Sequence, residues 1–231
     1  MIQELFEEVG GKFILSFDQI IEKNNQIKAY LLDWDGVFNN GQKYGKDGSL
    51  FNEADSMGLN LLRFSYWMKH GTLPIVGILS GERNETAITW TNRESIQSCY
   101  FKCGNKTIAL NHFLETHLLQ PNEIAYIFDD VLDLKVAEIV GLRFFLPRTN
   151  NPLFNQFVIK NSLADYCTST EGGNFAIREI AELMIAANGN FDEVIENRLN
   201  YSSIYYEYIQ IRNSIKVEYF TLINNQIINS L

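Results

Sequence analysis

Acidic and hydroxyl side chains stand directly after several short apolar runs of the chain. The runs end at residues 32, 79 and 128, and the polar residues that follow them are Asp33, Ser80 and Asp129. Apolar runs of this length are typical of parallel strands that are buried on both faces. Because ligands bind at the carboxyl ends of the strands in an open α/β sheet, we expect these three side chains to converge on one site.

The segment Asp33-Trp34-Asp35-Gly36 places two carboxylates two positions apart. An ionised Asp33 can attack a phosphorus atom and form an aspartyl-phosphate. Asp35 can then protonate the leaving oxygen and later activate a water molecule, and Gly36 lets the backbone approach a ligand closely. An ordinary strand-to-loop turn uses the same residue types, so this segment alone leaves both interpretations open.

A second acidic group, Asp129-Asp130-Val131-Leu132-Asp133, places three carboxylates after a strongly apolar run. Three neighbouring acids repel one another unless they lie on the surface or share a cation. Mg²⁺ prefers one or two carboxylates together with waters and substrate phosphate. We therefore expect Asp129 and Asp33 to bind Mg²⁺, with Asp130 and Asp133 supporting the site from outside the direct ligands.

Two further positions could hold a phosphoryl group. Ser80-Gly81 ends an apolar run, so the Ser80 hydroxyl and the nearby backbone N–H groups could bind a phosphoryl oxygen at a helix N-terminus. Lys106 opens a helical stretch and could neutralise the phosphate and the nucleophile together. The alternatives are an ordinary helix N-cap for Ser80 and a solvated surface position for Lys106.

Strand-like runs alternate with amphipathic stretches from residue 27 onward, which predicts an α/β fold with a parallel sheet and helices on both faces. The expected strands are residues 27–32, 74–79, 99–101, 124–128 and 142–146, and the expected helices lie near 57–70, 84–95, 105–118 and 131–140. Residues 37–52, with a turn at 45–48, predict a β-hairpin that could act as a flap over the site.

The two ends of the chain differ in pattern from this central part. We divide the chain into an N-terminal helical extension (1–26), an α/β domain (27–187) and a C-terminal helical extension (188–231). Apolar residues between 204 and 227 predict helices there, which either pack on their own domain or form an oligomer contact.

The composition limits the classes of function. The chain has 231 residues, 46% of them hydrophobic, and a net charge of −9. An acidic protein is a poor candidate for nucleic-acid binding, because it has no surplus of basic groups to contact phosphates. No apolar run approaches the ~18 residues that would span a membrane. Three cysteines without a CxxC pair favour a reducing compartment, so we expect a cytoplasmic protein. The acidic net charge fits a small-molecule substrate.

The order of these motifs resembles the haloacid dehalogenase superfamily of aspartyl-phosphate phosphatases. Within it, the chain is similar to the branch with a minimal cap, typified by 3-deoxy-D-manno-octulosonate 8-phosphate phosphatase, and to the phosphatase-like domains linked to acylneuraminate cytidylyltransferases. The stretches that carry the resemblance are residues 32–41, 44–48, 55–58, 78–84, 105–106, 125–133, 140–142 and 172–179. The resemblance implies a Rossmann-like fold and a Mg²⁺-dependent phosphatase of sugar-acid phosphates.

The resemblance also implies a role for each site residue. Asp33 would be the nucleophile and Asp35 the general acid/base, with Ser80 and Lys106 on the phosphoryl group. Mg²⁺ would be held by Asp33, the carbonyl oxygen of Asp35 and Asp129. Members of this branch are typically homotetramers, in which the flap and the Gly-Gly tail of a neighbour help to close the site, so residues 37–52 and 172–178 are assigned to subunit contacts and substrate access.

Several positions depart from the pattern of the octulosonate branch and bear on the substrate. Phe128 stands where a Gly is usual, Ala54 where an Arg is common, and Phe175 where the tail usually has a Gly. Arg83 and Arg178 are then the candidate groups for a substrate carboxylate, which a guanidinium can bind with two hydrogen bonds. An octulosonate 8-phosphate (lipopolysaccharide biosynthesis) and a nonulosonate 9-phosphate (sialic acid metabolism) remain as substrates, and the loss of the cation at Ala54 favours the latter. A phosphatase of another small metabolite and a non-catalytic subunit with the same fold are the rival hypotheses.

Overall fold

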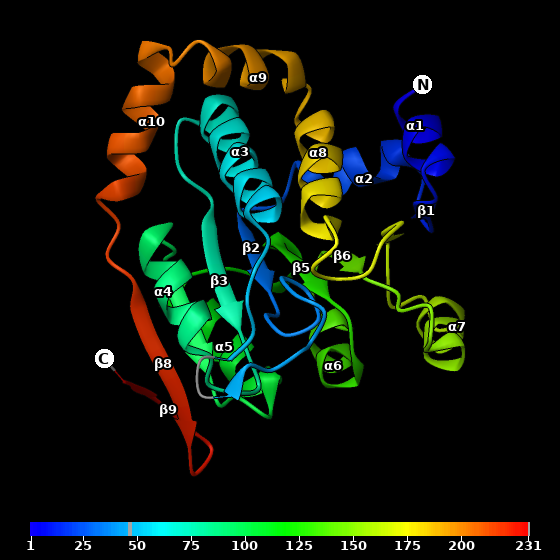
Figure 1. Cartoon of the computed structure of the whole chain (residues 1–231), viewed down its shortest axis with the longest axis vertical. Coiled ribbons are helices and arrows are strands. Elements are labelled where there is room, and N and C mark those ends of the chain that lie inside the picture. Colours follow the sequence, from blue (N-terminus) through cyan, green and yellow to red (C-terminus); the bar gives the residue numbers. More distant parts are fainter. Residues whose placement is uncertain (46–47, 231) are drawn as a thin grey trace.

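The computed structural model describes residues 1–45 and 48–230, and within these residues one mixed sheet organises the chain (Figure 1). The strand order is β1-β7-β6-β5-β2-β3-β4-β8-β9, with β1 and β9 antiparallel to their neighbours and all other pairs parallel. The strands are β1 Lys12–Phe13, β2 Ala29–Leu32, β3 Ile75–Leu79, β4 Ser98–Phe101, β5 Ile124–Phe128, β6 Leu142–Phe145, β7 Tyr166–Cys167, β8 Glu218–Ile223 and β9 Gln226–Asn229. The expected α/β architecture with a central parallel sheet is confirmed.

Helices cover both faces of the sheet because successive strand residues point into two separate cores. Tyr30 and Leu32 belong to the core under α2 Phe17–Asn24, α3 Glu53–His70, α4 Glu85–Arg93, α8 Ala176–Asn188, α9 Phe191–Leu199 and α10 Ser203–Asn213. Leu31 belongs to the other core, under α5 Lys106–His117, α6 Leu134–Ala137 and α7 Pro152–Lys160. Among residues 1–45 and 48–230, no helix combines the length and the apolar character that crossing a membrane requires.

The strand register aligns the carboxyl ends of the three central strands. Leu32 of β2 lies opposite Ile78 of β3 on one side and Ile127 of β5 on the other. Residues that follow these strands therefore emerge at the same edge of the sheet, at nearly the same height. This register brings Asp33, Ser80 and Asp129 to one edge, as the sequence predicted.

The C-terminal segment is only partly helical, so the prediction of helices through residue 227 is wrong. After α9 and α10, the chain forms strand β8, which pairs in parallel with β4, and β9, which turns back on β8. The N-terminal segment contains α1 Ile2–Glu8 and α2, joined by the two-residue strand β1 that pairs with β7. Strands from both end segments thus extend the central sheet at its two edges (Figure 1).

The predicted β-hairpin at 37–52 is also wrong for the described residues of that segment, which form a loop without strands. The N–H groups of Val37 and Phe38 both donate to Trp34 O, at 3.3 Å and 3.0 Å, so the chain turns here and is not extended as a strand requires. Tyr44 N–H still donates to Gly48 O at 2.7 Å, which closes the loop locally. Lys46 and Asp47, in the expected turn, lie outside the described residues.

Candidate active site

Trp34 separates the two carboxylates that follow β2, and it packs in the core. Asp33 continues the β2 ladder, since its N–H donates to Ile127 O at 3.0 Å, and its side chain is buried. Trp34 is fully buried and stacks on Phe38 with ring centroids 4.6 Å apart. The packing of Trp34 in the core therefore fixes the backbone at the point where Asp33 ends the ladder and Asp35 begins the loop.

Lys106 lies between two of the acidic groups. It is the first residue of α5, and the side chain of Asn105 caps that helix by accepting the Thr107 N–H. Its Nζ atom lies 2.8 Å from Oδ1 of Asp33 and 2.5 Å from Oδ1 of Asp133, and its side chain is only 3% exposed. A lysine so deeply buried is stable only when paired, so the alternative of a solvated surface lysine is excluded by this geometry.

Three buried carboxylates form a potential cation site. Asp33, Asp129 and Asp133 each offer an oxygen, and these oxygens all lie within 4.8 Å of one another. Oδ1 of Asp129 is buried and has no hydrogen-bond partner among the described residues. A cluster of hard oxygen donors that includes this oxygen fits a divalent cation such as Mg²⁺.

Asp130 and Asp133, which the sequence analysis treated alike, have different environments. Asp133 is buried, accepts from the Tyr126 hydroxyl and from Asp130 N–H, and contacts Lys106. Asp130 is exposed, and its side chain accepts the N–H of Val131 at 2.7 Å, at the start of a short 3-10 turn. Asp133 therefore lies within the charged cluster, whereas Asp130 shapes the turn that follows β5.

Burial sets the protonation behaviour of the cluster. Loss of water raises the pKa of Asp33 well above its usual range, and the neighbouring Lys106 opposes this rise. Burial raises the pKa of Asp129 to about 7, again opposed by a cation, Arg148. Burial alone would lower the pKa of Lys106, but Asp33 and Asp133 outweigh it and raise that pKa. A bound cation would restore the ionised form of the carboxylates.

Two site residues were missed by the sequence analysis. Arg148 contacts Oδ2 of Asp129 through Nη2, and the Tyr126 hydroxyl contacts Asp133. Tyr126 lies inside the apolar run of β5, where nothing distinguishes it from a core residue. Arg148 follows β6, and the rule that led to Asp33 could have found it, but Pro147 separates it from the end of the apolar run at Leu146.

The loop after Asp35 approaches both the acidic cluster and the start of α4. A Cβ atom at Gly36 would lie 2.1 Å from Oδ2 of Asp129, and one at Gly48 would lie 2.4 Å from Oδ1 of Asn84, the N-cap of α4. Ser49 is fully buried and its hydroxyl donates to Oδ1 of Asp35 at 2.6 Å, while Lys43 contacts Oδ2 of Asp35. The loop thus holds Asp35 from two sides.

The Gly-Gly tail packs on this loop within the same chain. Gly173 N–H donates to Val37 O at 3.2 Å, and a Cβ atom at Gly172 would lie only 1.9 Å from Gly36 O. The absence of side chains at these positions is what allows the two backbones to touch.

Ser80 and Phe128 occupy positions next to the cluster without crowding it. The Ser80 hydroxyl donates to Glu82 O at 2.9 Å, which forms a turn ahead of α4, and the helix cap itself is Asn84. A Cβ atom at Gly81 would lie 4.0 Å from Leu132, so this turn borders the loop after β5. Phe128 is fully buried and stacks on Tyr126, so its ring fills the core and not the site.

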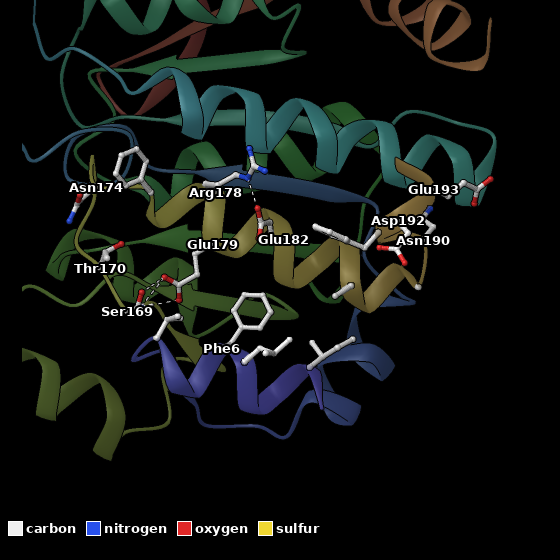
Figure 2. Close-up of a pocket in the computed structure, with 17 residues that line it drawn as sticks. Phe6, Ser169, Thr170, Asn174, Arg178, Glu179, Glu182, Asn190, Asp192 and Glu193 are labelled. Atoms are coloured by element: carbon white, nitrogen blue, oxygen red, sulfur yellow. Dashed lines mark hydrogen bonds and ion pairs between the residues drawn. The ribbon is translucent and has the colours of Figure 1, made fainter. Parts of the chain in front are cut away.

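The two arginines proposed for a substrate carboxylate are engaged on the surface. Nε of Arg83 lies 2.6 Å from Glu85, and its guanidinium covers the ring of Phe101 at 5.0 Å. Nε of Arg178 lies 2.7 Å from Glu182. Arg178 also lines a cavity of about 940 Å³ between α1, α8 and the start of α9 (Figure 2). Neither Asp33 nor Lys106 lines this cavity, so it is separate from the acidic cluster.

The chain is similar in sequence and in fold to several known phosphatases. No protein-family model matches the chain. The chain is 30% identical over 178 residues to 3-deoxy-D-manno-octulosonate 8-phosphate phosphatase KdsC of Escherichia coli K12, covering 75% of this chain and 87% of the relative. The enzyme of the same name from Yersinia pestis is 28% identical over 179 residues, which are 76% of this chain and 88% of the relative.

Solved structures show the same likeness. The 3-deoxy-D-manno-octulosonate 8-phosphate phosphatase of Moraxella catarrhalis, in complex with a magnesium ion, a phosphate ion and a KDO molecule, has a TM-score of 0.66 and 27% identity, covering 79% of this chain and 99% of that chain. A HAD superfamily hydrolase of subfamily III A from Legionella pneumophila has a TM-score of 0.65 and 26% identity, covering 79% and 95%.

Proposed function

We propose that the chain hydrolyses the phosphate monoester of a phosphorylated keto-sugar acid in a Mg²⁺-dependent reaction. The premise is its family: the chain belongs to the 3-deoxy-D-manno-octulosonate 8-phosphate phosphatase family and is therefore a phosphatase of the HAD superfamily. The observation that carries this proposal is the buried contact between Lys106 and Asp33, beside an Asp129 oxygen that has no hydrogen-bond partner in the described part of the chain. Such a grouping is costly to bury and has no evident structural purpose.

Mg²⁺ is the cation that these residues fit. Asp33 and Asp129 would hold it through carboxylate oxygens, together with the carbonyl oxygen of Asp35, which the family resemblance adds. Asp133 would stay with Lys106 and Tyr126, and its charge would support the site. When bound, Mg²⁺ would neutralise the charge of the phosphoryl oxygens and of the carboxylates around them.

The first chemical step belongs to Asp33 and Asp35. A carboxylate oxygen of Asp33 attacks phosphorus, so that a P–O bond to Asp33 forms while the P–O bond to the sugar breaks. Asp35 gives its proton to the departing sugar oxygen. Lys106 holds Asp33 in place and offsets the repulsion between the anionic nucleophile and the anionic phosphate.

The second step returns the enzyme to its starting state. Asp35, now ionised, takes a proton from a water molecule that attacks the phosphorus of the aspartyl-phosphate. Phosphate leaves and the Asp33 carboxylate is regenerated. Ser49 and Lys43 keep Asp35 oriented during both steps, and Ser80 with the backbone N–H groups near Gly81 offers donors to the phosphoryl oxygens.

The substrate proposal rests on the curated relatives, which are named for octulosonate 8-phosphate. A phosphate-release assay with octulosonate 8-phosphate, acylneuraminate 9-phosphate and glucose 6-phosphate, with Mg²⁺ and with excess chelator, tests both the class and the cation. We expect kcat/KM to be highest for one of the two sugar acids and to be lost in chelator.

The variant R83A tests whether Arg83 leaves Glu85 to bind the substrate carboxylate, and R178A tests the same for Arg178 and Glu182. Equal rates on all three substrates, unchanged in both variants, would contradict the substrate proposal.

Self-association into a homotetramer is part of the same proposal. Exposed apolar side chains at Leu5, Val9 and Phe175 border the cavity along α8 and are available for a subunit contact. Light scattering at micromolar concentration tests this, and a mass near 26.6 kDa, that of one chain, would contradict it.

A further inference from the structure

Arg148 is anchored at its backbone and reaches the acidic cluster with its side chain. Its carbonyl oxygen accepts from Asn151 N–H at 3.0 Å and from Nδ2 of Asn155 at 2.8 Å, at the entrance to α7. The guanidinium contacts Oδ2 of Asp129 and is 30% exposed, whereas Asp129 is 1% exposed. Within residues 1–45 and 48–230, Arg148 is the only cation in an ion pair with Asp129.

The two oxygens of Asp129 therefore have different surroundings. Oδ2 is taken by Arg148, while Oδ1 is buried without a partner among the described residues. Asp129 is one of the three carboxylates whose oxygens come within 4.8 Å of one another. Oδ1 is then the oxygen left for a cation, and Arg148 need not move away for the cation to bind.

The backbone above the pair leaves it little freedom. A Cβ atom at Gly36 would lie 2.1 Å from Oδ2 of Asp129 and 2.2 Å from Nη2 of Arg148. Gly172 in turn packs on the backbone of Gly36, where its Cβ atom would lie 1.9 Å from the carbonyl oxygen. Gly36 thus packs directly on the contact, with Gly172 behind it, and a side chain at Gly36 would displace Oδ2 of Asp129 or the guanidinium of Arg148.

We propose that Arg148 is a positioning residue, which holds Oδ2 of Asp129 so that Oδ1 faces the cation that Asp33 and Asp129 share. This inference rests on the proposed function, since it assigns Arg148 to the Mg²⁺ site. Partners that orient metal ligands from behind typically affect metal affinity by about 10- to 100-fold. Arg148 is expected to act mainly on cation affinity and only secondarily on substrate binding.

The test measures Mg²⁺ binding by isothermal titration calorimetry and, separately, the rise in melting temperature with added Mg²⁺. We expect R148Q to weaken Mg²⁺ binding about tenfold or more. R148K, which keeps the charge but not the planar donor group, should recover part of the affinity. The matched control is R143Q, because Arg143 also pairs with a buried carboxylate, that of Asp165, through Nη2 at 2.6 Å. R143Q should lower the melting temperature and leave the Mg²⁺ affinity within twofold of the wild type.

Each result decides the inference. Wild-type Mg²⁺ affinity in R148Q would overturn it, and so would tighter binding, which would mean that Arg148 competes with the cation. If R148Q does not melt cooperatively, R148K decides, and wild-type affinity in R148K overturns the inference. Absence of Mg²⁺ binding to the wild-type protein would instead refute the proposed function, so the two failures are distinguishable.

Discussion

Nζ of Lys106 lies 2.8 Å from Oδ1 of Asp33, and both side chains are less than 10% exposed. The same ammonium lies 2.5 Å from Oδ1 of Asp133, so one buried cation serves two buried carboxylates. The three groups come from three different elements, the start of α5, the end of β2 and the turn after β5. The fold thus places Lys106 next to Asp33, as the proposed roles of nucleophile and charge partner require.

Replacing Lys106 by Met should affect both activity and stability. Loss of the cation leaves Asp33 and Asp133 buried together without Lys106. Removing one member of a buried ion pair lowers the free energy of unfolding by about 3–5 kcal/mol. The proposed role in offsetting phosphate charge predicts a fall in kcat of about 100-fold or more. Steady-state assays beside thermal melts check this, with K135M as control, because Lys135 pairs with Glu138 on the surface. A kcat for K106M within threefold of K135M would exclude the proposed role.

Replacing Ser49 by Ala should lower kcat while leaving Mg²⁺ affinity unchanged. The Ser49 hydroxyl donates to Oδ1 of Asp35 at 2.6 Å, and without it the Asp35 carboxylate keeps, among the described residues, its side-chain contact with Lys43. We expect a loss of about tenfold, the size of one net hydrogen bond that orients a reacting group. The control is S214A, since the Ser214 hydroxyl binds Ile211 O at the end of α10, away from the site. Equal kcat in S49A and S214A would show that Ser49 does not orient Asp35 for catalysis.

Ligands bind at the carboxyl ends of parallel strands, and this rule explains which parts of the site were predictable. Asp33 and Asp129 each follow a fully apolar run, and parallel pairing of β2 with β5 brings them together, so local patterns were sufficient. Arg148 was missed because Pro147 separates it from the apolar run that ends at Leu146. Strand β8 was missed because its pairing with β4 joins residues more than a hundred positions apart, and no local signal records such a partner. The loop at 37–52 carries hairpin turn residues, but its first residues form a turn in which the N–H groups of Val37 and Phe38 both donate to Trp34 O, so no strand begins there.

Replacing Asp55 by Asn should make stability less dependent on pH. Burial raises the pKa of Asp55 to about 6 from an ordinary 3.8, while backbone N–H groups at the start of α8, such as that of Arg178, oppose the rise. Between these two pH values the folded state holds a proton that the unfolded state has lost, so wild-type stability falls as the pH rises. The amide introduced by D55N does not titrate in this range, and its oxygen can still accept the Arg178 N–H, which Asp55 accepts at 2.9 Å.

The melting temperature of D55N relative to the wild type should therefore increase from pH 4 to pH 7. A shift of about two pKa units changes the free energy of unfolding by at most about 3 kcal/mol. For a chain of this size, that changes the melting temperature by several degrees. The control is L59A, an uncharged change on the same buried face of α3, whose difference from the wild type should be flat with pH. A D55N difference as flat as that of L59A would contradict the assigned cause.

The central claim is that Asp33 carries the phosphoryl group during turnover, and trapping that group tests it most directly. Wild-type protein is mixed with Mg²⁺ and the best sugar-acid phosphate, quenched in acid during steady-state turnover, digested and weighed by mass spectrometry. We expect the peptide containing Asp33 to gain the mass of one phosphoryl group. D33N, which keeps the shape of the side chain but loses the nucleophile, should stay folded, gain no mass and release no phosphate. Phosphate release by D33N within tenfold of the wild type, or a phosphoryl group on any other peptide of the wild-type protein, would contradict the claim.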